Sequence, residues 1–203
     1  MKKILQQSLE KAMSYQTFRN LVTTLVQENK STGTTQTEAL SNYSLLSDRR
    51  MKRLDKTLKL TDETVETIKN LNEEFIFLVL MESWCGDGAQ TIPVMNKIAE
   101  LTPNIELKIA LRDENDDLMQ HFLTNGGKAI PKLIILEKET LHVISDWGSR
   151  PSIATKMVND YKEKNGSLDA EFKKDLQVWY NKDKGITTQK DIVSLLKVFQ
   201  NVS

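Results

Sequence analysis

Two apolar runs near the middle of the chain place the strongest constraint on its fold. They read FIFLVLM at 75–81 and IELKIAL at 105–111. Strands this rich in Phe, Leu, Ile and Val are typical of a sheet that is buried on both faces. The residues between them predict a helix at 86–101, and a helix between two such strands predicts a parallel crossover connection.

The residues that follow predict two more strands and two more helices. We expect a helix at 115–124, strands at 133–137 and 141–146, and a helix at 151–164. Because only a few residues separate these last two strands, they predict an antiparallel hairpin. The order βαβαββα therefore predicts an α/β fold, with a central mixed sheet and helices on both faces.

The two ends of the chain carry helical patterns only. We expect a helical extension over 1–60, the sheet-containing core over 61–164 and a second helical extension over 165–203. In the first extension, the basic run RRMKR at 49–53 is interpreted as the solvated face of an amphipathic helix. In the second, Thr188 and Asp191 resemble a capping box at the start of the last helix.

Composition excludes several classes of partner and cofactor. Lys and Arg number 28, as do Asp and Glu, so there is no electrostatic reason to expect nucleic acid or an anionic membrane as partner. No apolar run approaches the roughly 20 residues that span a bilayer, and the first residues lack the core of a secretory signal. One cysteine builds neither a disulfide nor a zinc site, so we expect no metal, no cofactor and a cytoplasmic location.

That single cysteine lies in the motif WCGDGAQ, where the first predicted strand ends and a helix begins. The partial positive charge of a helix N-terminus stabilises a thiolate, which predicts a lowered pKa for Cys85. Trp84 would shield one side of the sulfur, and Gly86 and Gly88 would let the backbone turn closely around it. The alternative is that Cys85 is a small buried hydrophobe, as free cysteines usually are. Its position favours the reactive thiol.

A second feature, GGKAIP at 126–131, directly precedes a predicted strand. A proline at the entry to a strand needs an edge or a turn, and only an X-Pro bond adopts the cis form cheaply. A cis Ile130–Pro131 bond would turn the backbone of Ile130 toward the sulfur. An ordinary trans proline in a loop is the alternative, and the local sequence alone favours it.

Taken together, these features resemble the thioredoxin family. The features are Trp-Cys-Gly after an apolar strand, Pro93 inside the next helix, Ile130-Pro131 before a hairpin and Trp147-Gly148 after it. The resemblance covers roughly residues 61–164. More narrowly, ESWCGDGAQ, LRDENDD, NGGKAIPKLIIL and WGSRP resemble thioredoxin-like bacterial proteins that usually carry a small residue where redox thioredoxins carry a second cysteine. The resemblance implies a thioredoxin-like fold with a nucleophilic Cys85.

The sequence departs from the redox members of that family at two positions. Gly88 stands where their resolving cysteine would be, and Val79 stands where they bury an aspartate. Without a resolving thiol, a dithiol mechanism is excluded. We therefore expect a monothiol redox activity, in which Cys85 forms mixed disulfides with a low-molecular-weight thiol or a protein partner.

A non-catalytic function is the alternative. In that case the groove between Trp84, Ile130-Pro131 and Trp147-Gly148 holds an extended segment of a partner through backbone hydrogen bonds. The helical extensions would then form an interaction surface, and Cys85 would be a relic.

Charged neighbours act on the thiol in opposite directions. Glu82 and Asp87 would raise its pKa. Arg112, at the end of the second strand, should lie on the same edge of the sheet, and Arg150 would approach from the other side. Two arginines would suit the carboxylates of a peptide-like thiol. The alternative is that both arginines pair with nearby acids, Asp113 and Asp146.

Overall fold

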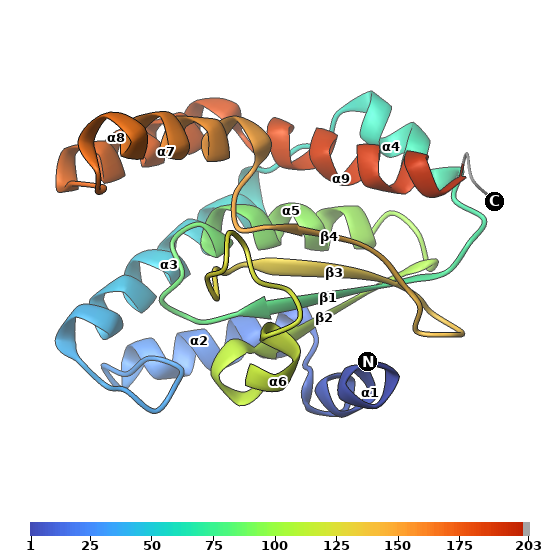
Figure 1. The fold of residues 1–203 in the computed structure, drawn as a ribbon, viewed down its shortest axis with the longest axis horizontal. Coiled ribbons are helices and arrows are strands. Elements are labelled where there is room, and N and C mark those ends of the chain that lie inside the picture. Colours follow the sequence, from blue (N-terminus) through green and yellow to red (C-terminus); the bar gives the residue numbers. More distant parts are fainter. Residues whose placement is uncertain (201–203) are drawn as a thin grey trace.

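The computed structural model describes residues 1–200 and confirms the predicted mixed sheet (Figure 1). Four strands lie in the order β2-β1-β3-β4, with β1 and β2 parallel and the other two pairs antiparallel. Their bounds are β1 Phe75–Met81, β2 Ile105–Leu111, β3 Lys132–Glu137 and β4 Val143–Gly148.

Helices surround this sheet on both faces (Figure 1). Helices α5 and α9 lie over one face, and α1 and α6 lie on the other. The bounds are α1 Lys2–Lys11, α2 Tyr15–Gln27, α3 Glu38–Thr57, α4 Asp62–Lys69, α5 Gly88–Ala99, α6 Asp116–Met119, α7 Ser152–Asn165, α8 Ala170–Asp183 and α9 Ile186–Gln200. Both faces are covered, which is why every residue of β1 is buried.

Two elements differ from their predicted extents. The helix expected at 115–124 is a 3-10 turn at Arg112–Glu114 followed by the single-turn α6. The last strand begins at Val143 instead of 141, because Leu141 has a φ of 61° in the turn of the hairpin. Helix α3 begins at Glu38, because the side chain of Thr37 accepts the amide hydrogen of Leu40 and caps the helix.

The predicted capping box at the start of the last helix is wrong. Helix α9 begins at Ile186, and the carboxylate of Asp183 accepts the amide hydrogen of Thr187 in its first turn. Asp191 is therefore free for a different role. Its carboxylate accepts the indole hydrogen of Trp147 at 3.0 Å, and the amide and hydroxyl hydrogens of Ser152 at 2.8 and 2.7 Å.

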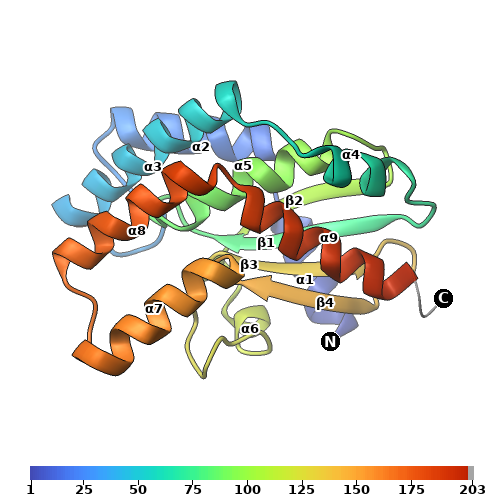
Figure 2. The same cartoon turned by 90° about the horizontal axis from the view of Figure 1, so that it is seen from above.

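Helices α7 and α8 lie at one end of the molecule, and α9 runs from there across the sheet (Figure 2). Helices α7 and α8 share a hydrophobic cluster that is separate from the main core and contains Val158, Phe172 and Leu176. Helix α9, by contrast, contributes Ile192 and Leu196 to the main core. The extension is thus joined to the sheet by α9, while α7 and α8 pack mainly on each other.

We predict that Asp191→Ala destabilises the fold by about 1 to 3 kcal/mol. Three donors, two of them on Ser152 at the start of α7, lose their common acceptor. Urea denaturation followed by tryptophan fluorescence measures the change. Asp160→Ala is the matched control, because Asp160 makes only an exposed ion pair with Lys156. An equal loss in both variants would contradict the role given to Asp191.

Candidate functional site

The sulfur of Cys85 lies in the loop between β1 and α5, beside the segment that enters β3. The thiol donates a hydrogen bond to the carbonyl oxygen of Ile130, with the sulfur 3.3 Å from that oxygen. The sulfur also accepts the amide hydrogen of Gly88 at 3.4 Å. Only 6% of the residue is exposed to solvent. The thiol is therefore held on both sides by backbone groups and is largely shielded from water.

This burial sets the ionisation of the thiol. Loss of solvation, followed by the charge of Asp87, raises the pKa of Cys85 to about 12. The hydrogen bond from Gly88 opposes this shift but is the weaker effect. The lowered pKa expected from the helix N-terminus is therefore wrong. The helix end supplies one amide, whereas burial removes the water that would stabilise the charge.

The Ile130–Pro131 peptide bond is cis. The local alternative of a trans loop proline is thus wrong, and the expected approach of the Ile130 backbone to the sulfur is confirmed. The backbone of Gly148 packs closely against the backbone of Pro131. A Cβ atom added there would lie 2.2 Å from the carbonyl oxygen of Pro131, and the φ of 132° also requires glycine.

Gly88 and Val79 mark the two departures from redox thioredoxins, and apolar groups fill the space around both. A Cβ atom at Gly88 would stand 3.4 Å from the sulfur of Cys85 but only 2.2 Å from that of Met81. The Met81 side chain thus occupies the place that a resolving thiol would need. Val79 is fully buried in β1, between Ile109 and Leu133 on the neighbouring strands.

A largely buried carboxylate beside the thiol, that of Asp87, organises the rest of the site. Asp87 accepts hydrogen bonds from Arg150 at 2.8 Å and from the hydroxyl of Tyr180 at 3.0 Å. Burial raises the pKa of Asp87, and the charge of Arg150 acts against that rise. Burial and the charge of Asp87 also raise the pKa of the Tyr180 hydroxyl. Arg150 therefore pairs with Asp87 instead of Asp146, whose partner is Lys132.

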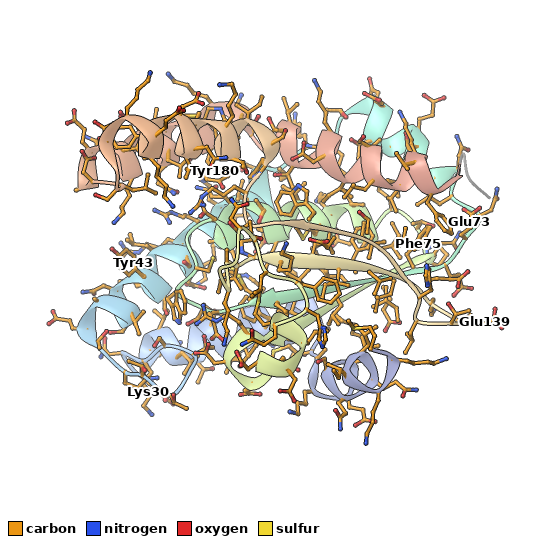
Figure 3. All side chains as sticks on the ribbon, viewed as in Figure 1. Lys30, Tyr43, Glu73, Phe75, Glu139 and Tyr180 are labelled. Carbon is orange, nitrogen blue, oxygen red and sulfur yellow. The ribbon has the colours of Figure 1, made fainter. Side chains whose placement is uncertain are left out.

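Helix α8 places Tyr180 over this loop and adds two further polar contacts to the body of the protein. Figure 3 shows Tyr180 between α8 and the helices beneath it. Gln177 accepts a hydrogen bond from Gln90 of α5 at 3.0 Å, and Asn181 accepts one from Arg53 of α3 at 2.7 Å. Sequence reasoning missed Tyr180 and Gln177, because a tyrosine on an amphipathic helix is indistinguishable from an ordinary core residue.

Arg112 lies on the expected edge but does not reach the thiol. Its guanidinium lies 5.0 Å from the centre of the Trp84 ring and donates two hydrogen bonds, at 2.7 and 2.8 Å, to one carboxylate oxygen of Asp113. Glu82, at the end of β1, is buried and accepts the amide hydrogen of Asp113 at 2.9 Å. Burial raises the pKa of Glu82.

The structure thus brings the expected site residues around one loop, but packs them closely. Ile130 and Trp147 are each only 8% exposed. Among residues 1–200, no group of three or more His, Cys, Asp and Glu side chains is arranged to hold a metal ion. Within the same residues, no helix combines the length and apolar character needed to cross a bilayer.

Comparison with known proteins agrees with this architecture. A family model described as thioredoxin matches residues 33–162, which is more than half of the chain. The solved structure of a protein of unknown function from Pseudomonas aeruginosa is 19% identical, with 91% of this chain and 98% of that chain covered and a TM-score of 0.58. An HIV epitope-scaffold has the same identity and coverage, with a TM-score of 0.56. At 19% identity this likeness shows the fold alone. No curated protein matches the sequence significantly.

We predict that Cys85 of the folded protein reacts slowly with iodoacetamide at pH 8 and gains reactivity as the pH rises toward 12. With a pKa of about 12, only about one thiol in ten thousand is ionised at pH 8, and the thiolate is the nucleophile. Mass spectrometry of samples quenched over time measures the rate. The urea-unfolded chain is the control, because its thiol titrates near a pKa of about 8.5. A native thiol that titrates at or below that value would contradict the assignment.

Proposed function

Because this chain belongs to the thioredoxin family, we propose that it uses the thioredoxin fold to bind a protein partner without thiol catalysis. One observation carries this proposal. The only thiol donates a hydrogen bond to the Ile130 carbonyl in a site with little access to water, and its pKa is raised to about 12. A neutral, buried thiol is a poor nucleophile at physiological pH.

The composition of the motif supports the same proposal. A mixed disulfide on Cys85 would have no thiol within the chain to release it, since Gly88 stands at the second position. Met81 and Val79 place apolar groups where the dithiol chemistry of the family needs polar ones. We place this protein in the cytoplasm, where a lone cysteine stays reduced. Nucleic acid and membranes are not among the partners we propose.

We also propose that the helical extensions provide the partner surface. The predicted groove is lined by Trp147 and Ile130, which are packed rather than open. Helices α3 and α8 instead present exposed side chains, such as Arg49 and Val178, around the same end of the molecule. A partner bound there would lie above the motif without touching the sulfur.

The test is a disulfide-exchange assay with glutathione and a small disulfide, in which added glutathione reductase reduces the glutathione disulfide formed and the oxidation of NADPH reports turnover. We expect the protein to show no turnover above that of its Cys85→Ser variant, because the thiolate population is too small. The same samples checked by circular dichroism confirm that both are folded. Turnover that depends on Cys85 would refute the non-catalytic proposal.

Monothiol exchange is a second candidate, favoured by the chemistry of the contacts around the thiol. Tyr180 and Arg150 hold Asp87 through a hydrogen bond and an ion pair, which are contacts that water can replace. If Tyr180 and Arg150 move away from Asp87 during function and expose the thiol, Cys85 would form mixed disulfides with a small thiol or a protein partner. Tyr180→Phe would then speed the reaction of Cys85 with glutathione disulfide by at least fivefold, whereas Tyr161→Phe, which removes a hydroxyl far from Asp87 along α7, would not.

A further inference from the structure

Helix α3 exposes a row of positive charges that, within residues 1–200, no carboxylate pairs with. Arg49, Arg53 and Lys56 are spaced by four and three residues, so they share one face of the helix, and all three are exposed. Among the residues that the structure describes, none of the three forms an ion pair. We call these three residues the basic stripe. Leu46 is exposed on the turn before it, and Tyr43 lies further out on the same helix (Figure 3).

The basic stripe leads to an apolar pocket at the C-terminal end of α3. The pocket lies between that end, the segment after it and the junction of α8 with α9, and its volume is about 510 Å³. Leu54, Leu58 and Ile186 contribute apolar surface, and Ile186 is 40% exposed. A pocket of this size and character is within the range of specific binding sites.

The charges around this pocket are all positive. Arg53, Lys59 and Lys184 line it, and none of its lining residues is acidic. Arg53 bonds only the neutral side-chain oxygens of Asn181 and Gln90, and within residues 1–200 neither lysine has a carboxylate partner. Because the chain as a whole carries no net charge, this is a local excess that a negatively charged ligand would complement.

The combined length of the basic stripe and the pocket indicates the kind of ligand. The basic stripe spans roughly 10 Å of helix, at 1.5 Å per residue, before the pocket is reached. A small anion would occupy one end only, whereas an extended polypeptide segment would contact the stripe and fill the pocket. The apolar surface needs an apolar side chain, which a nucleic-acid backbone does not offer.

We propose that the basic stripe and the adjoining pocket bind an acidic segment of a protein partner, with an apolar side chain of that segment inserted in the pocket. This inference rests on the proposed partner-binding function and specifies the chemistry of the partner. Tyr180 also lines the pocket while its hydroxyl donates a hydrogen bond to Asp87, so one residue connects the pocket with the loop that holds Cys85.

The experiment uses fluorescein-labelled synthetic peptides and fluorescence anisotropy with the full-length protein. The probe is a twelve-residue peptide of Glu and Asp with a central Leu-Phe pair. One comparison peptide replaces that pair with Ser-Ser, and another replaces every acid with Lys. We expect binding of the first peptide, at least tenfold weaker binding of the Ser-Ser peptide, and none of the Lys peptide. Raising the salt concentration should weaken binding, because exposed charges are screened.

The protein variants test the location. Lys59→Glu combined with Lys184→Asp should weaken binding of the Leu-Phe peptide at least tenfold; Asp suits position 184, whose φ is 55°. Lys3→Glu combined with Lys69→Glu is the control with the same change in charge, because both lysines are exposed, outside the pocket and without an ion-pair partner in the part of the chain that the structure describes. It should retain binding within twofold. Thermal melts of both variants check that each is folded.

Several outcomes would overturn the inference. They are equal losses in the two variants, equal binding of the Leu-Phe and Ser-Ser peptides, and binding of duplex DNA or phosphatidylglycerol vesicles in place of the acidic peptide. The peptide should also bind the Cys85→Ser variant unchanged. Turnover that depends on Cys85 would refute the proposed non-catalytic function and leave this binding site untouched. Peptide binding that is unchanged in the variant of Lys59 and Lys184 would refute this binding site and leave the proposed function untouched.

Discussion

The structure around the motif depends on one largely buried carboxylate. Asp87 is removed from water beside a thiol, which is costly unless a cation and hydrogen-bond donors compensate its charge. Arg150 and Tyr180 supply that compensation from segments that follow it in the chain by 63 and 93 residues. Satisfying Asp87 therefore requires that the loop after β1, the turn after β4 and helix α8 be assembled together.

The position of Asp87 distinguishes the site of this chain from that of a redox-active thioredoxin. The ingredients of the family site are present, with the sulfur beside the Ile130 carbonyl and a glycine closing onto Pro131. The negative charge of Asp87, however, lies beside the sulfur and opposes a thiolate, as does burial. The C-terminal helices contribute Tyr180, whose hydroxyl donates a hydrogen bond to Asp87 and so helps to cover the motif.

Much of the fold could be predicted because its signals are local. FIFLVLM is apolar throughout and IELKIAL is rich in Ile and Leu, so their strands were correct in extent, and the hairpin followed from the short gap between β3 and β4. The proximity of Cys85 to Ile130 was also predictable, because the Trp-Cys-Gly motif and the later Ile-Pro pair occur in the order found in the thioredoxin family. The role of Asp191 was not, because the same residue types that form a capping box also accept hydrogen bonds from a distant indole. The short helix α6 shows that an acidic start does not by itself extend a helix.

The sequence by itself determined the class of fold, the neighbourhood of the thiol and the loss of dithiol chemistry, because apolar periodicity, Ile-Pro and the missing cysteine are properties of short segments. Only the tertiary structure decided the state of that thiol. A pKa reflects the competition between solvation and nearby charges, and both depend on which distant segments exclude water and which bring Asp87, Arg150 and Tyr180 together. For the same reason the uncompensated charges on α3 became a site only when α8 and α9 closed a pocket at their end.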